Sequence, residues 1–146
     1  MPRFPALVLL TFAVAGFSQA PATKDDPLAL GLERISAGDY KDAKLLLERA
    51  VKQEPRNAKA WMNLGIARGK LGDEKGRFEA YQRALEIDPN YAQAHFNLAV
   101  AYLLVGKKCD ATAEAAALER LDAELFEKLG WLTRITCDPL GCGCGP

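Results

Sequence analysis

Four cysteines and one histidine are the residues of this 146-residue chain whose types and spacing can support chemistry. Cys109 stands apart, whereas Cys137, Cys142 and Cys144 lie within the last ten residues, among glycines and prolines. An even number of cysteines favours disulfides in an exported protein, and four cysteines permit three pairings. We favour a bond from Cys109 to one of the tail cysteines, because it would fix an otherwise loose, Gly-rich end.

Two other interpretations of these cysteines stay open. A Cys142–Cys144 bridge would close a very short loop, so it would be strained, easily reduced and redox-active. Zinc or copper(I) would need all four thiolates, or three of them together with His95. A single C-x-C pair is a weak signal for either chemistry, so we expect structural disulfides and no metal or other cofactor.

The rest of the sequence does not indicate an enzyme or a nucleic-acid binder. No motif places a carboxylate or hydroxyl beside His95, and there is no phosphate-binding glycine loop or nucleophile elbow. The chain carries 19 basic and 19 acidic residues, so its formal net charge is zero. A nucleic-acid binder would normally show a basic stripe, and none is present in the sequence.

A fixed period of 34 residues organises the chain. Gly38, Gly72 and Gly106 are separated by this interval, and so are Pro55 and Pro89. Such a period indicates one helical hairpin that is copied along the sequence, here as blocks of about 24–57, 58–91 and 92–125. Apolar residues return at three- and four-residue steps within each block, as amphipathic helices require.

The middle block carries the clearest motif. Its characteristic residues are Trp61, Leu64, Gly65, Tyr81, Ala84 and Pro89. This pattern resembles the tetratricopeptide repeat family, although Arg68 and Arg77 stand where Tyr and Ala are usual. The third block has Tyr102 and Ala111, and His95 takes the Trp61 position, where we expect it to serve helix packing.

The resemblance implies an all-α, right-handed superhelix, or solenoid, of three helix-turn-helix repeats. Because the third block lacks the closing proline, we expect its second helix to run on as one long helix from Asp110 to Lys128, ending near Gly130. This Leu-rich end would cap the last repeat. The repeat domain would then cover residues 21–130, followed by a Cys/Gly-rich tail, 131–146.

Local signals agree with this architecture. Small residues at Gly31, Gly65 and Ala99 would let the two helices of each hairpin approach closely. The pairs Gly38-Asp39 and Gly72-Asp73 predict a left-handed helix stop followed by an N-cap. Further N-caps are predicted at Asp26, Asn57 and Asn90.

The resemblance also implies a binding groove, because the first helix of each repeat lines the concave face in this family. The groove positions are Leu28, Leu32, Met62, Asn63, Ile66, Phe96, Asn97 and Val100. The apolar members would hold a hydrophobic segment, and the two asparagines would hydrogen-bond an extended backbone. Alternatively, some of these residues pack only against neighbouring helices. A carboxylate clamp is not expected, since only Lys59 approaches that pattern.

The first twenty residues predict a secretory signal. A single positive charge at Arg3 precedes an apolar run from Ala6 to Phe17, and Ser18 to Ala20 supplies small residues for cleavage. The run is shorter than the roughly 20 apolar residues of a membrane span. We therefore expect cleavage near Ala20, a periplasmic or secreted product, and no membrane span afterwards.

Three classes of function follow. The leading one is a non-catalytic protein–protein interaction module with a scaffold or assembly role, which binds a peptide or protein segment in the groove. The second is a metal-binding or thiol-redox module that uses the tail cysteines. The third is a homo-oligomeric subunit, such as a homodimer, that pairs through the Leu-rich last helix and through Trp131 and Leu132.

Overall fold

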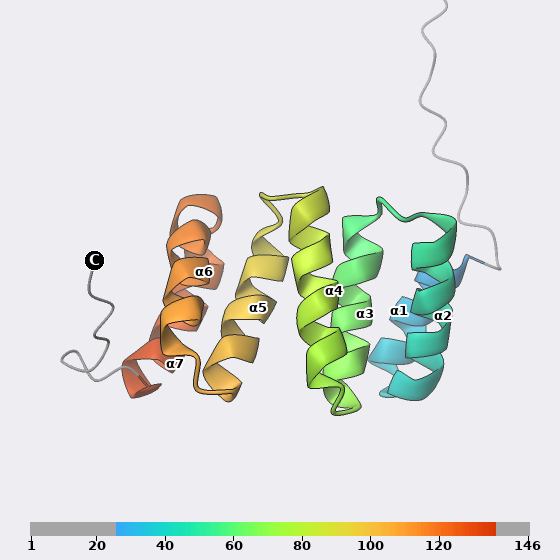
Figure 1. Ribbon diagram of the computed structural model, residues 1–146, viewed down its shortest axis with the longest axis horizontal. Coiled ribbons are helices and arrows are strands. Elements are labelled where there is room, and N and C mark those ends of the chain that lie inside the picture. The colour runs from blue at the N-terminus through green and yellow to red at the C-terminus, as the bar shows by residue number, and fades with distance from the viewer. Residues whose placement is uncertain (1–25, 137–146) are drawn as a thin grey trace, which may run out of the picture.

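The computed structural model describes residues 26–136, with side chains described as far as Gly130. This part of the chain is entirely helical and contains no strand. Its helices are α1 (Pro27–Ser36), α2 (Tyr40–Gln53), α3 (Ala58–Lys70), α4 (Glu74–Ile87), α5 (Ala92–Leu104), α6 (Lys108–Leu121) and α7 (Ala123–Thr136). Figure 1 shows them standing side by side in one row, from α1 and α2 at one end to α6 and α7 at the other.

The predicted hairpins are present: α1 packs on α2, α3 on α4, and α5 on α6. Each hairpin turns at a glycine with a left-handed backbone, with φ of 77° at Gly38, 80° at Gly72 and 75° at Gly106. Residues with a side chain rarely adopt this conformation, which explains why glycine recurs at the 34-residue interval. The repeats form the predicted all-α superhelix.

Most of the predicted caps are confirmed. Asp39 accepts a hydrogen bond from the backbone N–H of Asp42, and Asp73 accepts one from Gly76. Asp26 and Asn57 cap α1 and α3 in the same manner. The prediction of Asn90 as the cap of α5 is wrong: Tyr91 occupies the cap position, and it makes no side-chain cap bond.

The prediction of one long helix from Asp110 to Lys128 is also wrong. The chain breaks at Asp122, whose backbone is extended with φ −155° and ψ 98°. The Asp122 carboxylate then accepts a hydrogen bond from the backbone N–H of Leu125 at 3.0 Å and so starts α7. The last helix continues past Gly130 to Thr136, and α7 packs on α5 and α6 as a separate capping helix.

Two glycines bring paired helices close together, as predicted. A Cβ on Gly31 would lie 2.8 Å from Cγ of Leu47, and a Cβ on Gly65 would overlap the ring of Tyr81. In the third hairpin Ala99 is fully buried at the corresponding place. Glycine is therefore required here for space, whereas at the turns it is required for backbone conformation.

The core is divided among the helix interfaces. One cluster, centred on Leu47 and Leu64, joins the first two hairpins, and a second, centred on Tyr81 and Leu98, joins the second and third. A third cluster joins Leu118 and Leu129 and seats α7 on the last hairpin. Each hairpin thus depends on its neighbours for burial, as expected of a repeat array. Within residues 26–136, each helix is too short or too polar to traverse a bilayer.

Candidate functional site

A hollow of about 420 Å³ lies between α3, α4 and α5, and we call it the α3–α5 hollow. Its lining residues are Ile66, Gly69 and Lys70 from α3, Arg77 and Tyr81 from α4, and Phe96, Asn97, Val100, Ala101 and Leu104 from α5. Its surface is mostly apolar. Leu104 is 71% exposed at its edge, although exposing a leucine to water is unfavourable without a partner.

Half of the predicted groove residues line this hollow. They are Ile66, Phe96, Asn97 and Val100. Of the others, Leu28 packs against the core between the first two hairpins, and Leu32 is half-buried. The structure thus brings Ile66 of the second repeat together with the three predicted residues of the third, and it leaves those of the first repeat apart from them.

The remaining two predicted groove residues, Met62 and Asn63, are buried. The Asn63 amide donates to the backbone carbonyl of Lys59 at 2.7 Å, within its own helix. The Asn97 amide donates to Sδ of Met62 at 3.3 Å, and its oxygen accepts from Gln93 at the same distance. Both asparagines therefore serve contacts inside the array.

Sequence reasoning missed Lys70, Arg77, Tyr81 and Leu104 as lining residues. Burial raises the pKa of Tyr81 to about 12; the Arg77 charge lowers it and the Glu74 charge raises it, both by less. The phenol therefore stays neutral at physiological pH. The family resemblance implied only first helices as groove walls, whereas Arg77 and Tyr81 reach the hollow from a second helix, α4.

Arg77 replaces the usual alanine of the repeat, and its surroundings are adapted to it. A Cβ on Gly69 would overlap the Arg77 side chain. The arginine side chain therefore packs directly over this glycine. The guanidinium lies 5.5 Å from the centre of the Phe78 ring and pairs with Glu74. Its Nε is buried without a hydrogen-bond acceptor among the described residues.

Arg68 replaces the usual tyrosine and is accommodated in the same way. Its side chain runs close to Gly76, where a Cβ would lie 2.9 Å from Cδ of Arg68. The guanidinium donates to the Gly76 carbonyl and to Glu48, both at 3.3 Å. Because Glu48 belongs to α2, this arginine ties the first hairpin to the second.

His95 joins α5 to α6. Its Nδ1 lies 2.6 Å from the Glu114 carboxylate, and its Nε2 lies 2.9 Å from the Pro89 carbonyl oxygen. Because the Pro89 carbonyl oxygen can only accept a hydrogen bond, the Nε2–H donates to it, and Nδ1 faces the Glu114 carboxylate. The predicted packing role of His95 is thus accompanied by a polar link that no motif had indicated.

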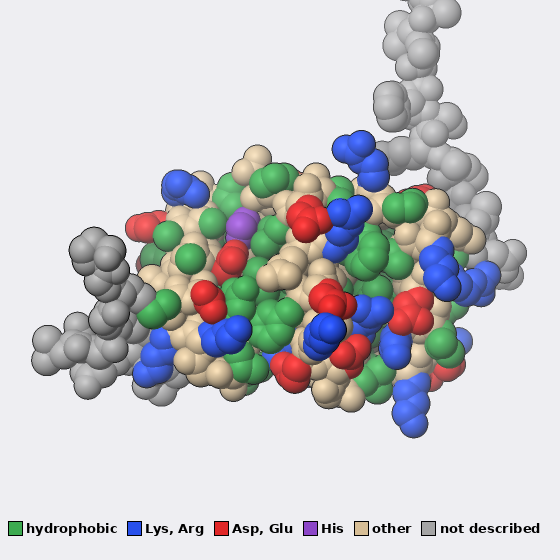
Figure 2. Space-filling model, in the orientation of Figure 1, with side chains coloured by type: hydrophobic (Ala, Val, Ile, Leu, Met, Phe, Trp, Pro, Cys, Tyr) green, Lys and Arg blue, Asp and Glu red, His purple; other side chains and the backbone are tan. Residues whose placement is uncertain are grey.

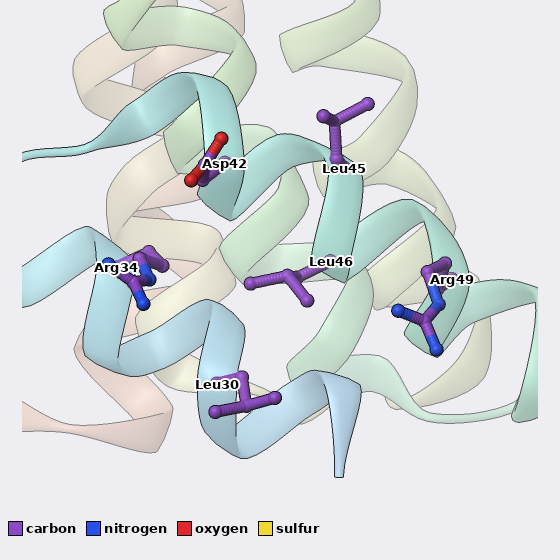
Figure 3. Close-up of a pocket in the computed structure, with 6 residues that line it drawn as sticks. All are labelled: Leu30, Arg34, Asp42, Leu45, Leu46 and Arg49. Atoms are coloured by element: carbon purple, nitrogen blue, oxygen red, sulfur yellow. The ribbon is translucent and has the colours of Figure 1, made fainter. Parts of the chain in front are cut away.

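A second hollow, of about 330 Å³, lies on the first hairpin. It is lined by Leu30, Arg34, Asp42, Leu45, Leu46 and Arg49. Figure 3 shows Leu46 pointing from α2 toward Leu30 of α1, whereas Leu45 points away from α1. Leu45 is 61% exposed. This is the end of the array that has no preceding repeat among the described residues.

Several leucines near the end of the described chain are buried inside the array. Leu118 and Leu129 are fully buried, and Leu125 packs against the same cluster. The side chains of Trp131 and Leu132, and the tail cysteines, lie outside the described residues. Cys109 lies in the first turn of α6, and its pairing with the tail stays a prediction. Among the described residues, no three His, Cys, Asp or Glu side chains are grouped as a metal site would require.

Charged side chains are mixed over the visible surface. Figure 2 shows acidic and basic groups interspersed on the face of the molecule that it presents, with apolar side chains between them. This distribution agrees with the zero formal charge of the sequence. On this face no continuous basic stripe is seen that would suit a nucleic-acid backbone.

Comparison with known proteins establishes the family. Two sequence profiles, both described as tetratricopeptide repeat, match residues 28–92 and 80–115. Together they span residues 28–115, which include parts of all three hairpins that the structure shows. The chain belongs to the tetratricopeptide repeat family. A search of curated protein sequences finds no match.

Solved structures share the fold at low identity. The type III secretion translocator chaperone SycD of Yersinia enterocolitica has a TM-score of 0.73 at 17% identity, over 80% of this chain and 85% of SycD. MamA has 0.67 at 22%, over 74% of this chain and 65% of MamA. The second repeat domain of Spaghetti (RPAP3), bound to the HSP90 peptide SRMEEVD, has 0.63 at 20%, over 66% and 89%. A chaperone and a peptide-bound domain are thus among the proteins of like fold.

Proposed function

We propose that this chain is a non-catalytic interaction module that holds a peptide or protein segment in the α3–α5 hollow. It would serve as a scaffold or assembly factor in the compartment to which it is exported. The observation that carries the proposal is an apolar hollow walled by the first helices of two successive repeats. The peptide-bound domain of like fold supports it by analogy of architecture.

The exposure of Leu104 gives the sharpest test. Leu104 lines the hollow and is 71% exposed, so Leu104→Asp changes the site without entering the core. Leu45 offers a matched control, because it is similarly exposed but lies on the first hairpin. Met62 is unsuitable for this purpose, since a charge at a buried position would unfold the array.

The experiment combines crosslinking with these two variants. A photo-crosslinking amino acid is placed at position 104 or at position 45, and adducts formed in the native compartment are identified by mass spectrometry. We expect a defined adduct from position 104, and we expect Leu104→Asp to weaken binding of that purified partner at least about tenfold, because it replaces an apolar contact with a desolvated charge. Leu45→Asp should leave the affinity unchanged.

The opposite pattern would show that the binding site is not the α3–α5 hollow. If Leu45→Asp removes binding while Leu104→Asp does not, the first hairpin is the docking surface. If the adduct from position 45 is a second copy of this chain, the homo-oligomer becomes the better description. Analytical ultracentrifugation of the two variants would then show which leucine the self-association requires.

The export step of the proposal rests on the sequence of the first twenty residues. N-terminal sequencing of the protein from its native host should give a chain that begins near Pro21. Fractionation should place that chain outside the cytoplasm. Recovery of a chain that still carries Met1 to Ala20 in the cytoplasm would contradict this part.

A further inference from the structure

The α3–α5 hollow carries positive charge as well as apolar side chains. Lys70 and Arg77 both line it, and none of its lining residues carries a carboxylate. Glu74 pairs with Arg77 but does not line the hollow. The Lys70 ammonium lies 6.0 Å from the centre of the Tyr40 ring and is not among the described ion pairs.

The local sequence is arranged to bring Arg77 to this place. Gly69 leaves the room through which the Arg77 side chain passes, and Phe78 and Glu74 fix the direction of its guanidinium. A side chain held in this way loses little conformational freedom when it meets a ligand. An arginine in the interior of an array is otherwise costly, because its charge must be desolvated.

We propose that the hollow recognises a protein segment that carries a carboxylate side chain, Asp or Glu, next to a large apolar side chain. Arg77 and Lys70 would receive the carboxylate, while Phe96, Val100 and Leu104 would contact the apolar group. The inference rests on the proposed function, since it specifies the partner that the same hollow accepts. A charge-assisted hydrogen bond in a partly desolvated site is stronger than one between neutral groups.

The experiment identifies a peptide ligand by selection, so no ligand sequence is assumed. A random peptide library displayed on phage is selected against the folded chain, with the Leu104→Asp variant as the counter-selection. Selected peptides are synthesised in matched pairs in which each Asp or Glu is replaced by Asn or Gln. Affinities are measured by fluorescence anisotropy for the unsubstituted chain and for three variants, Lys70→Gln, Arg77→Gln and Lys75→Gln.

We expect the selected peptides to be enriched in an acidic residue adjacent to an apolar one. Neutralising that acid should weaken binding about tenfold, the size expected of a charge-assisted contact. In Lys70→Gln and Arg77→Gln the difference between the two peptides of a pair should fall below about threefold, as the loss of a coupled partner requires. Lys75→Gln should retain the full difference, because Lys75 is 89% exposed and does not line the hollow.

Different results would contradict the proposed function and the preference for an acidic segment. If no peptide is selected, or if Leu104→Asp binds all of them equally well, the proposed function fails and this inference falls with it. If peptides bind and depend on Leu104 but the acid-to-amide change alters affinity less than about twofold, only this inference is overturned. Far-UV circular dichroism checks that each variant is folded. Lys70 is exposed, so Lys70→Gln should fold and can still test the inference if Arg77→Gln unfolds.

Discussion

Trp61 and His95, one repeat apart, donate a ring N–H to equivalent proline carbonyls at the same distance. The Trp61 Nε1 donates to the Pro55 oxygen at 2.9 Å, and the His95 Nε2 lies 2.9 Å from the Pro89 oxygen. The aromatic residue at this position therefore fastens the second and third repeats to the closing turn of the repeat before each of them. In the third repeat the smaller ring leaves a second nitrogen free to reach Glu114 of α6.

The first prediction follows from this equivalence. His95→Ala removes both contacts and should lower the free energy of unfolding by about 1–3 kcal/mol, since both hydrogen bonds are partly buried. His95→Trp keeps an N–H for the Pro89 carbonyl and should lose clearly less. Urea denaturation followed by circular dichroism measures both. Equal losses in the two variants would show that the bond to Pro89 does not matter.

The second prediction concerns the close approach of α3 and α4. Gly65→Ala places a Cβ against the Tyr81 ring and should destabilise the array by about 1–3 kcal/mol through overpacking. Gly130→Ala is the matched control, because no described atom lies within 4 Å of the added Cβ and alanine favours helix by about 1 kcal/mol. Thermal melts of the two variants should shift in opposite directions. A loss in Gly130→Ala as large as that in Gly65→Ala would argue against the steric cause.

The third prediction tests whether α7 belongs to the cooperative fold. Leu129 is fully buried against Leu118, so Leu129→Ala should cost about 2–5 kcal/mol. Leu121→Ala, in the preceding helix, should cost less than about 1 kcal/mol, because Leu121 is on the surface. Denaturant midpoints provide the comparison. If Leu129→Ala is as mild as Leu121→Ala, α7 does not contribute to the stability of the array.

The fourth prediction is a pH dependence at Tyr81. Its pKa is raised from 10.0 to about 12, chiefly because the phenol is buried. Between these values the native state retains a proton that the unfolded chain has lost, so this stabilising contribution is complete below pH 10 and declines as pH rises toward 12. The slope should be about 1.4 kcal/mol per pH unit.

Tyr81→Phe isolates this contribution from those of the other tyrosines. The variant should lack that part of the slope above pH 10, while Tyr91, whose pKa is also raised by burial and by Asp88, continues to contribute. Absorbance titration at 295 nm should show that folded Tyr81→Phe has one late-ionising tyrosine fewer than the unsubstituted chain. Identical slopes in the two proteins would refute the assignment.

The 34-residue period predicts most of the fold, including the end of the second helix in each hairpin. Glu54, Asp88 and Asp122 are spaced by 34 residues, and the backbone N–H of each closes its helix by donating to a residue four positions earlier. This register predicts the break at Asp122 even though the third block lacks a proline. The same register places the start of α5 at Tyr91, which is equivalent to Asn57, and not at Asn90.

The candidate site was less accessible to sequence reasoning. Ile66, Phe96, Asn97 and Val100 could be predicted because the family resemblance implies inward positions on the first helix of each repeat. The sequence shows Arg77 only as a departure from the family pattern. The space that Gly69 leaves for its side chain depends on how α3 packs against α4, which the sequence does not show. The contact of His95 with Glu114 was hidden for the same reason, since 19 residues separate them.

The α3–α5 hollow has walls from two hairpins, with α3 and α4 on one side and α5 on the other. Units of a repeat array touch only their neighbours, so flexing concentrates at the joints between them. A ligand lodged across such a joint would brace it and hold the two units at one angle. Occupancy would then fix the angle between the second and third hairpins, and with it part of the curvature of the array.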